Sequence, residues 1–175
     1  MQKGEFMNNQ IIIEQVDLLN IDDFDSLWQN AIKNAHESLW INKTDQEMFG
    51  VMNKVKNSYR NFIDVPFGPK LFTAKISNEY VGFIDSFERT DIYESGIVQI
   101  GTIYVKDSHK GRGIGSLLIK KIIESYDAEL FWLEAKNSSI DFFKKNGFKK
   151  YSDVKINMIY EKNGIYYKNC YVFKK

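Results

Sequence analysis

The chain has 175 residues, of which 43% are hydrophobic and 27% are charged, and its formal net charge is +1. This length predicts one domain with its own core and is too short for two. A net charge near zero argues against a general nucleic-acid binder. No apolar run approaches a membrane span, and the N-terminus lacks the pattern of a secretory signal. We therefore expect a cytoplasmic protein, monomeric or homodimeric, that binds neither nucleic acid nor membrane.

The charges are distributed unevenly along the chain. Residues 1–91 carry 9 Lys and Arg against 14 Asp and Glu, whereas residues 92–175 carry 15 against 9. An anionic cofactor on the second half and a neutral or cationic substrate on the first would fit this asymmetry, and ordinary solvated surface charge would fit it equally. With one cysteine, Cys170, and two histidines, an intrachain disulfide is impossible and zinc ligands are scarce. We expect Cys170 to be buried and no metal to be bound.

The first half of the chain predicts a strand, two helices and three further strands. Residues 1–9 have no periodicity and are expected to form a disordered tail, so the domain spans residues 10–175. Thr44 and Glu47 have the spacing of a capping box at the start of the second helix. In chain order, apolar spacing predicts a strand over 11–16, helices over 21–40 and 44–62, and strands over 71–76, 80–87 and 97–105.

A glycine-rich segment, residues 110–115 (Lys-Gly-Arg-Gly-Ile-Gly), joins the strand over 97–105 to a helix expected over 113–126. Three glycines in five positions leave the backbone N–H groups uncovered, and the helix adds the positive end of its dipole. The main chain alone can therefore bind phosphate oxygens. The spacing places the following apolar stripe on this helix: Ile114, Leu117, Leu118, Ile122 and Tyr126.

The rest of the chain predicts a strand, a short helix and a closing hairpin. Ser138 and Asp141 have capping-box spacing, and Gly147 is expected just past the end of that helix. The predicted elements are a strand over 129–135, the helix, and strands over 154–160 and 165–173 around a type I′ turn at residues 163–164. The full order is β-α-α-β-β-β-α-β-α-β-β.

This order and the glycine loop together resemble the GNAT superfamily, the acetyl-CoA-dependent N-acetyltransferases. The family's signature is Gln or Arg, two residues, Gly, one residue, then Gly or Ala, and residues 110–115 match it except for Lys110 in the first position. Residues 142–148 (Phe-Phe-Lys-Lys-Asn-Gly-Phe) are similar to the family's Phe-Tyr-x-x-x-Gly-Phe segment. Over residues 11–173 the resemblance implies a single GNAT-like α/β (α+β) domain, with a mixed, mostly antiparallel sheet flanked by helices.

The resemblance also implies an acetyl-CoA site built mostly from main chain. The strand over 97–105 and the next strand would splay apart, and the pantetheine arm would pair with the first near its end. The pyrophosphate would bind the N–H groups of residues 111–116, and the side chains of Lys110 and Arg112 would reach the phosphates. The expected contacts are Ile103, Tyr104, Val105, Lys110, Gly111, Arg112, Gly113, Ile114, Gly115, Ser116, Asn137 and Phe143.

The family's usual proton-transfer groups do not carry over. The position of its glutamate base is Gln99, which could at most orient a water, and the position of its tyrosine acid is Phe143. Glu134 is the best remaining base, provided that partial burial raises its pKa, but it could equally be exposed or paired with a lysine. Asp85 has similar standing for a catalytic or substrate-binding role.

A phenol could also approach from Tyr104 or Tyr151, or water could protonate the leaving thiolate. Acceptor binding is expected near His36 and Trp40, although both could equally belong to the core or the surface. These residues complete the predicted site.

The preferred hypothesis is an N-acetyltransferase that moves an acetyl group from acetyl-CoA to a primary amine of a small cationic molecule. A catalytically silent acyl-CoA-binding sensor or regulatory module is the alternative, because the usual Glu and Tyr are missing. A dinucleotide-binding enzyme would explain Gly111, Gly113 and Ser116 with Glu134 further on. The predicted antiparallel strands leave that fold no repeated parallel βαβ unit.

Overall fold

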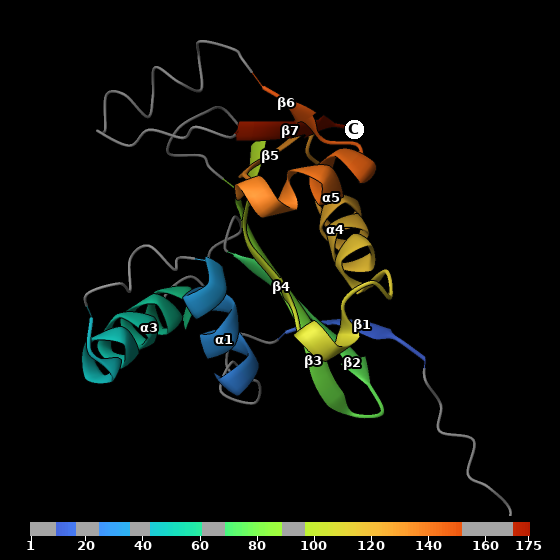
Figure 1. Ribbon diagram of the computed structural model, residues 1–175. Helices are drawn as coiled ribbons and strands as arrows, with labels where there is room; N and C mark the ends of the chain where they lie inside the picture. The colour runs from blue at the N-terminus through green and yellow to red at the C-terminus, as the bar shows by residue number, and fades with distance from the viewer. Residues whose placement is uncertain (1–9, 17–24, 36–42, 61–68, 89–96, 152–169) are drawn as a thin grey trace, which may run out of the picture.

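The computed structural model describes residues 10–16, 25–35, 43–60, 69–88, 97–151 and 170–175 (Figure 1). The predicted tail over 1–9 and the predicted turn at 163–164 lie outside these residues, as do His36 and Trp40. The strands are β1 (Ile12–Gln15), β2 (Lys70–Ile76), β3 (Glu79–Glu88), β4 (Ile97–Val105), β5 (Leu130–Glu134), β6 (Lys149–Lys150) and β7 (Cys170–Lys174). The helices are α1 (Asp25–Ala35), α3 (Asp45–Arg60), α4 (Ile114–Ser125) and α5 (Ile140–Lys145), with 3-10 turns η2 (Asp107–His109) and η3 (Asn137–Ser139).

The strands form one sheet in the order β1-β2-β3-β4-β5-β7-β6. Every pair is antiparallel except β4 with β5, so the predicted mixed, mostly antiparallel sheet is confirmed. The last strand, β7, lies between β5 and β6, and Trp132 of β5 is paired with Val172 of β7. The C-terminal strand is therefore an interior strand of the sheet.

Two helices cover opposite faces of the sheet, as Figure 1 shows for α1 and α4. Alternate residues of β3 decide which face is which, because successive side chains point to opposite sides. Phe83 packs with Leu27 and Trp28 of α1, whereas Ile84 belongs to the cluster that contains Leu118 of α4. We call these the α1 face and the α4 face.

The local signals at the ends of two helices are confirmed. The Thr44 N–H donates to Glu47 Oε2 at 2.8 Å and the Glu47 N–H donates to Thr44 Oγ1 at 3.3 Å, which is the predicted capping box. The hydrogen bonds that the Thr44 N–H and the Thr44 hydroxyl donate to the Glu47 carboxyl lower its pKa. Gly147 has φ +87°, and the N–H groups of Gly147 and Phe148 donate to the carbonyls of Lys144 and Phe143. That pair of bonds is a Schellman motif.

Two local predictions are wrong. α5 begins at Ile140 without a side-chain cap, and the Ser139 hydroxyl donates to the Lys136 carbonyl at 2.9 Å, so Ser138 and Asp141 form no capping box. The reason is η3, which shifts the helix start by one residue. On α4, Leu117 is 41% exposed. Ile119 is buried in its place, because Leu118 centres the apolar stripe and Leu117 falls at the stripe's edge.

Candidate functional site

Strands β4 and β5 diverge, as the resemblance implies. Their parallel pairing covers only the first part of β4 and ends at Gln99 opposite Trp132. Pairing with β3, in contrast, continues to Val105 opposite Gly82. Beyond Gln99, the edge of β4 that faces β5 thus has no strand partner within the described residues.

The backbone groups on this open edge can be identified from hydrogen bonds on the other edge. The Lys106 N–H donates to Val81 O at 2.9 Å, and the Thr102 N–H donates to Asp85 Oδ1 at 2.5 Å, so both point toward β3. Because the N–H groups of successive strand residues point to alternate edges, those of Ile103 and Val105 point toward the open side. An extended chain could pair with them like an added strand.

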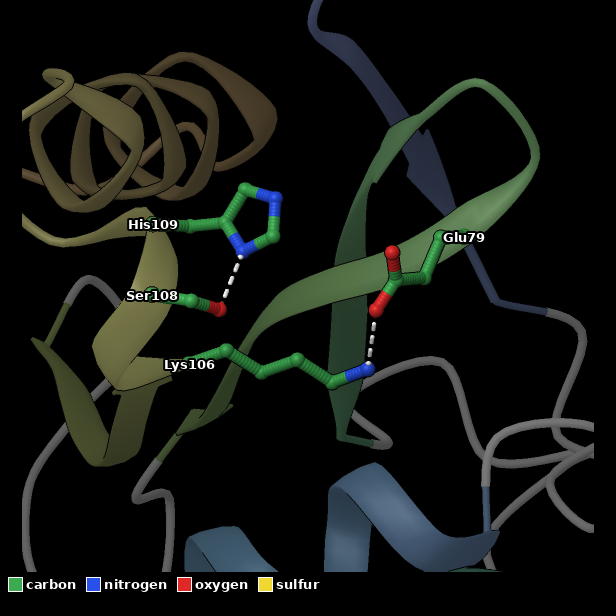
Figure 2. Close-up of polar contacts among 4 residues, drawn as sticks. All are labelled: Glu79, Lys106, Ser108 and His109. Atoms are coloured by element: carbon green, nitrogen blue, oxygen red, sulfur yellow. Dashed lines mark hydrogen bonds and ion pairs between the residues drawn. The ribbon is translucent and has the colours of Figure 1, made fainter.

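The glycine loop follows β4 through η2 and is attached to the neighbouring hairpin. Figure 2 shows the Lys106 side chain extending toward Glu79, with Nζ and Oε1 2.7 Å apart. On the other side of the same loop, Ser108 Oγ lies 2.9 Å from His109 Nδ1. The hydrogen bond from Lys106, together with its charge, lowers the pKa of the Glu79 carboxyl. The Lys106–Glu79 pair therefore connects the segment just after β4 to the start of β3.

Gly111 and Gly113 are needed for their backbone conformation. Their φ angles are +77° and +79°, where side-chain-bearing residues are strained. A Cβ atom at either position would meet no other atom within 4 Å, so the surroundings of both are open. Gly115 has a different function, since its Cβ would lie 2.9 Å from Phe142 Cζ. Its small size lets α4 pack against α5.

The N-terminus of α4 has the electrostatics of an anion site. Gly113 is the N-cap, no side chain caps the helix, and the first turn carries no acidic residue. The Leu117 N–H donates to the Gly113 carbonyl at 3.1 Å, and N–H groups before it have no acceptor within the helix. Two exposed cations, Lys110 and Arg112, flank these groups, and Lys110 Nζ lies 2.6 Å from Asp107 Oδ1.

Phe143 and Asn137, which are also expected to contact acetyl-CoA, differ in their surroundings. Phe143 is 4% exposed and belongs to the α4-face core, with its ring centroid 5.1 Å from Phe142 and 5.9 Å from Phe148. A core ring therefore occupies the position that the resemblance assigns to the family's tyrosine. Asn137 is exposed at the start of η3.

The four candidate catalytic residues share the α1 face. Gln99 is paired with Phe87, which packs against the α1 cluster, and Asp85 alternates with Phe87 along β3. Glu134 is paired with Cys170, and Tyr151 packs against the cluster that contains Cys170. The alternation of side chains along β3, β4 and β5 places Asp85, Gln99 and Glu134 on one side of the sheet, and Tyr151, just after β6, packs on the same side.

Their burial differs. Asp85 is 1% exposed, Gln99 and Tyr151 are partly buried, and Glu134 is exposed, which is the alternative that the sequence left open for it. Cys170 is buried as expected, and burial together with the charge of Glu134 raises the pKa of its thiol to about 11.

Among the residues that the structure describes, no group of three His, Cys, Asp or Glu side chains could hold a metal ion. None of the helices in the same part of the chain is long and apolar enough to cross a bilayer.

Comparison with known proteins identifies a family. The profile described as the acetyltransferase (GNAT) family matches residues 14–148. No curated protein matches the sequence significantly.

Three solved structures illustrate the similarity of the fold. The PaiA N-acetyltransferase of Thermoplasma acidophilum, solved with coenzyme A, has a TM-score of 0.64 and 14% identity over 95% of this chain and 99% of its own. A GNAT-family acetyltransferase of Staphylococcus aureus has a TM-score of 0.67 and 14% identity over 94% and 99%. An aminoglycoside acetyltransferase from an uncultured soil metagenomic sample, solved with sisomicin, has a TM-score of 0.58 and 18% identity over 80% and 89%. At these identities the likeness shows a shared fold.

Proposed function

The chain belongs to the acetyltransferase (GNAT) family, and from this premise we propose that it transfers the acetyl group of acetyl-CoA to a primary amine of a small cationic molecule. The transfer is a direct attack within a ternary complex. The observation that carries the proposal is the open edge of β4 leading into a glycine loop and an uncapped helix N-terminus. Acetyl-CoA has a matching shape, because its extended pantetheine arm can pair with the strand edge while its phosphates reach the loop and the helix N-terminus.

The residues present fit acetyl-CoA. The backbone of Ile103 and Val105 offers a strand edge for the pantetheine arm. The space beside Gly111 and Gly113 is open where a Cβ would lie, so a pyrophosphate can approach the backbone N–H groups of residues 111–116. Lys110 and Arg112 add positive charge at the mouth of the site. Acetyl-CoA supplies the activated thioester, and binding it costs this chain no catalytic side chain.

Positioning supplies much of the rate. The amine nitrogen attacks the thioester carbonyl as the carbon–sulfur bond breaks, the amine loses a proton, and the thiolate gains one. Holding the two reactants in register is worth roughly 7–11 kcal/mol, so weak acid and base groups suffice. On the α1 face, Glu134 or a water held by Gln99 accepts the amine proton, and Tyr151 or water protonates the thiolate. Phe143 has no proton to donate.

The acceptor class is supported by charge. Residues 1–91 are net acidic, and α1 and α3 of that half lie on the same face of the sheet as the candidate catalytic residues. An acidic surface attracts a cationic amine. The structural neighbour solved with sisomicin acts on an aminoglycoside, which is consistent with an amine of this class, such as an aminoglycoside, a polyamine or an amino acid.

Binding is tested first by thermal unfolding. Acetyl-CoA should raise the melting temperature and NAD should not. In Gly113→Val the shift should disappear, because valine is strained at φ +79° and its side chain would cover the N–H groups. Gly50→Ala is the matched control: nothing lies within 4 Å of its Cβ either, but its φ is not positive, so the shift should persist. Stabilisation by NAD instead would refute the proposal.

Turnover is tested by thiol release from acetyl-CoA with a panel of amines. Transfer to any amine supports the enzyme. Binding without transfer to any amine would favour the silent acyl-CoA-binding module, for which the buried ring at Phe143 is the supporting observation.

A further inference from the structure

We propose that Asp85 is a positioning residue: its buried carboxylate holds a bulge in β4 that turns the backbone of Ile103 and Val105 toward the donor. The inference rests on the proposed function for the identity of the molecule at that edge. It deepens that function by giving Asp85, one of the four candidate catalytic residues on the α1 face, a role in shaping β4 and not in proton transfer.

The bulge is visible in the register of β3 and β4. Ser86 is paired with Ile100 and Ile84 with Ile103, so two residues of β4, Gly101 and Thr102, lie opposite Asp85 alone. A bulge of this kind disrupts the backbone ladder locally. Here the Thr102 N–H donates at 2.5 Å to the side-chain Oδ1 of Asp85. The carboxylate thus supplies an acceptor within the bulge.

Glycine at position 101 makes room for this carboxylate. A Cβ on Gly101 would overlap Asp85 Oδ1 and would lie 3.0 Å from the Phe87 ring. The hydrogen bond is also shielded from water, since Asp85 is 1% exposed and Thr102 is 4% exposed. A buried N–H that loses its acceptor destabilises the conformation that buries it. Asp85, Gly101 and Thr102 therefore form one unit.

The unit controls which groups reach the open edge. Val98 and Ile100 belong to the α4-face core, and after the bulge Ile103 and Val105 pack on the same face. Without the extra residue, the alternation of side chains would place Thr102 and Tyr104 on that face. The N–H groups of Ile103 and Val105 would then point toward β3 and not toward the open edge. The bulge begins two residues after Gln99, where pairing with β5 ends. It therefore sets the register in which the donor is held.

The first test compares Asp85→Ala with Asp85→Asn. In Asp85→Ala the Thr102 amide should exchange with solvent faster, measured by NMR hydrogen exchange. The KM for acetyl-CoA should rise about tenfold while kcat at saturation changes little, since affinity falls with the population of the competent conformation. Asp85→Asn keeps an oxygen acceptor and should restore both values. Ser86→Ala, the adjacent buried residue on the other face, is the control and should change neither.

A proton-transfer role would give a different pattern. If Asp85→Asn lost kcat as fully as Asp85→Ala, with KM and Thr102 exchange unchanged, the positioning proposal would be overturned.

A double-mutant cycle gives a second test, because it separates the coupling between two residues from the effect of each substitution alone. Gly101→Ala should raise Thr102 exchange and the KM for acetyl-CoA, because its Cβ displaces the carboxylate. When Asp85 is already replaced by alanine, Gly101→Ala should raise Thr102 exchange and the KM for acetyl-CoA much less. Additive effects would overturn the proposal. If wild-type protein neither bound nor used acetyl-CoA, the proposed function would fail, while the exchange data would still decide the inference about Asp85.

Discussion

The two faces of the sheet are built on different principles. On the α4 face, one continuous apolar cluster joins α4 to β2, β3, β4 and β5, and the buried hydroxyls of Ser86 and Tyr126 lie 3.0 Å apart and satisfy each other. On the α1 face, the apolar contacts fall into two separate clusters, and Asp85 and Thr73 are buried. The first face is a continuous apolar core, whereas the second buries polar side chains, one of which, Asp85, accepts a hydrogen bond from the backbone of β4.

The largest effect is expected from a cavity in the α4 face. Leu118 is fully buried in its cluster, so Leu118→Ala should lower the free energy of unfolding by about 2–5 kcal/mol. Leu117→Ala is the matched control on the same helix: that side chain is 41% exposed, and its loss should cost about 0.5 kcal/mol or less. Urea unfolding of both variants measures the difference. Equal losses would mean that the α4 face is not the continuous core described above.

The same contrast explains what could be predicted from sequence. The glycine loop was identifiable because positive φ angles at Gly111 and Gly113 restrict the residue type, and such a requirement is visible in a short motif. The strand over 97–105 was predicted with its observed bounds. Leu117 was misplaced because the edge of an apolar stripe depends on the partner surface, which the helix sequence alone does not contain.

The α1 face was harder to predict. The unit of Asp85, Gly101 and Thr102 joins residues sixteen or more positions apart through a register shift, and no local pattern encodes it. The position of β7 between β5 and β6 likewise depends on long-range pairing. Gln99 and Glu134 could be named as candidates from the resemblance, but their common face followed only from the strand pairing.

Alkaline pH should lower the free energy of unfolding in two separable steps, one from a buried group on each face. Burial raises the pKa of Tyr126 on the α4 face from 10.0 to about 12. Because the folded-state pKa is the higher one, the stabilisation is fully present below pH 10 and is lost as the pH rises toward 12, by up to about 2–3 kcal/mol. Burial likewise raises the pKa of Cys170 on the α1 face, from 9.0 to about 11, so its step begins nearer pH 9.

Unfolding midpoints measured between pH 8 and 12 test this assignment. Tyr126→Phe should be less stable at neutral pH, because it loses the hydrogen bond with Ser86, but should no longer show the step above pH 10. Cys170→Ala should remove the earlier step only. If Tyr126→Phe kept the full alkaline loss, the titrating group would lie elsewhere.

The smallest predicted change has the opposite sign and separates the two faces most directly. Thr73 on the α1 face is fully buried, and among the residues that the structure describes its hydroxyl has no hydrogen-bond partner. Thr73→Val keeps the shape and the β-branched side chain while removing the uncompensated polar group, so the free energy of unfolding should rise by about 1 kcal/mol. Ser86→Ala removes a buried hydroxyl from the other face, where it is paired, and should lower it by a similar amount.

Urea denaturation of the two variants decides between two views of the α1 face. Opposite signs would show that this face holds a polar group at a cost in stability that the α4 face does not bear. Acetyl transfer measured on Thr73→Val then locates the cause. A more stable variant with a raised KM for the amine would place the hydroxyl on the acceptor side, as expected where function opposes stability. A variant that lost stability would contradict the description of Thr73 as unsatisfied, and with it the proposed difference between the faces.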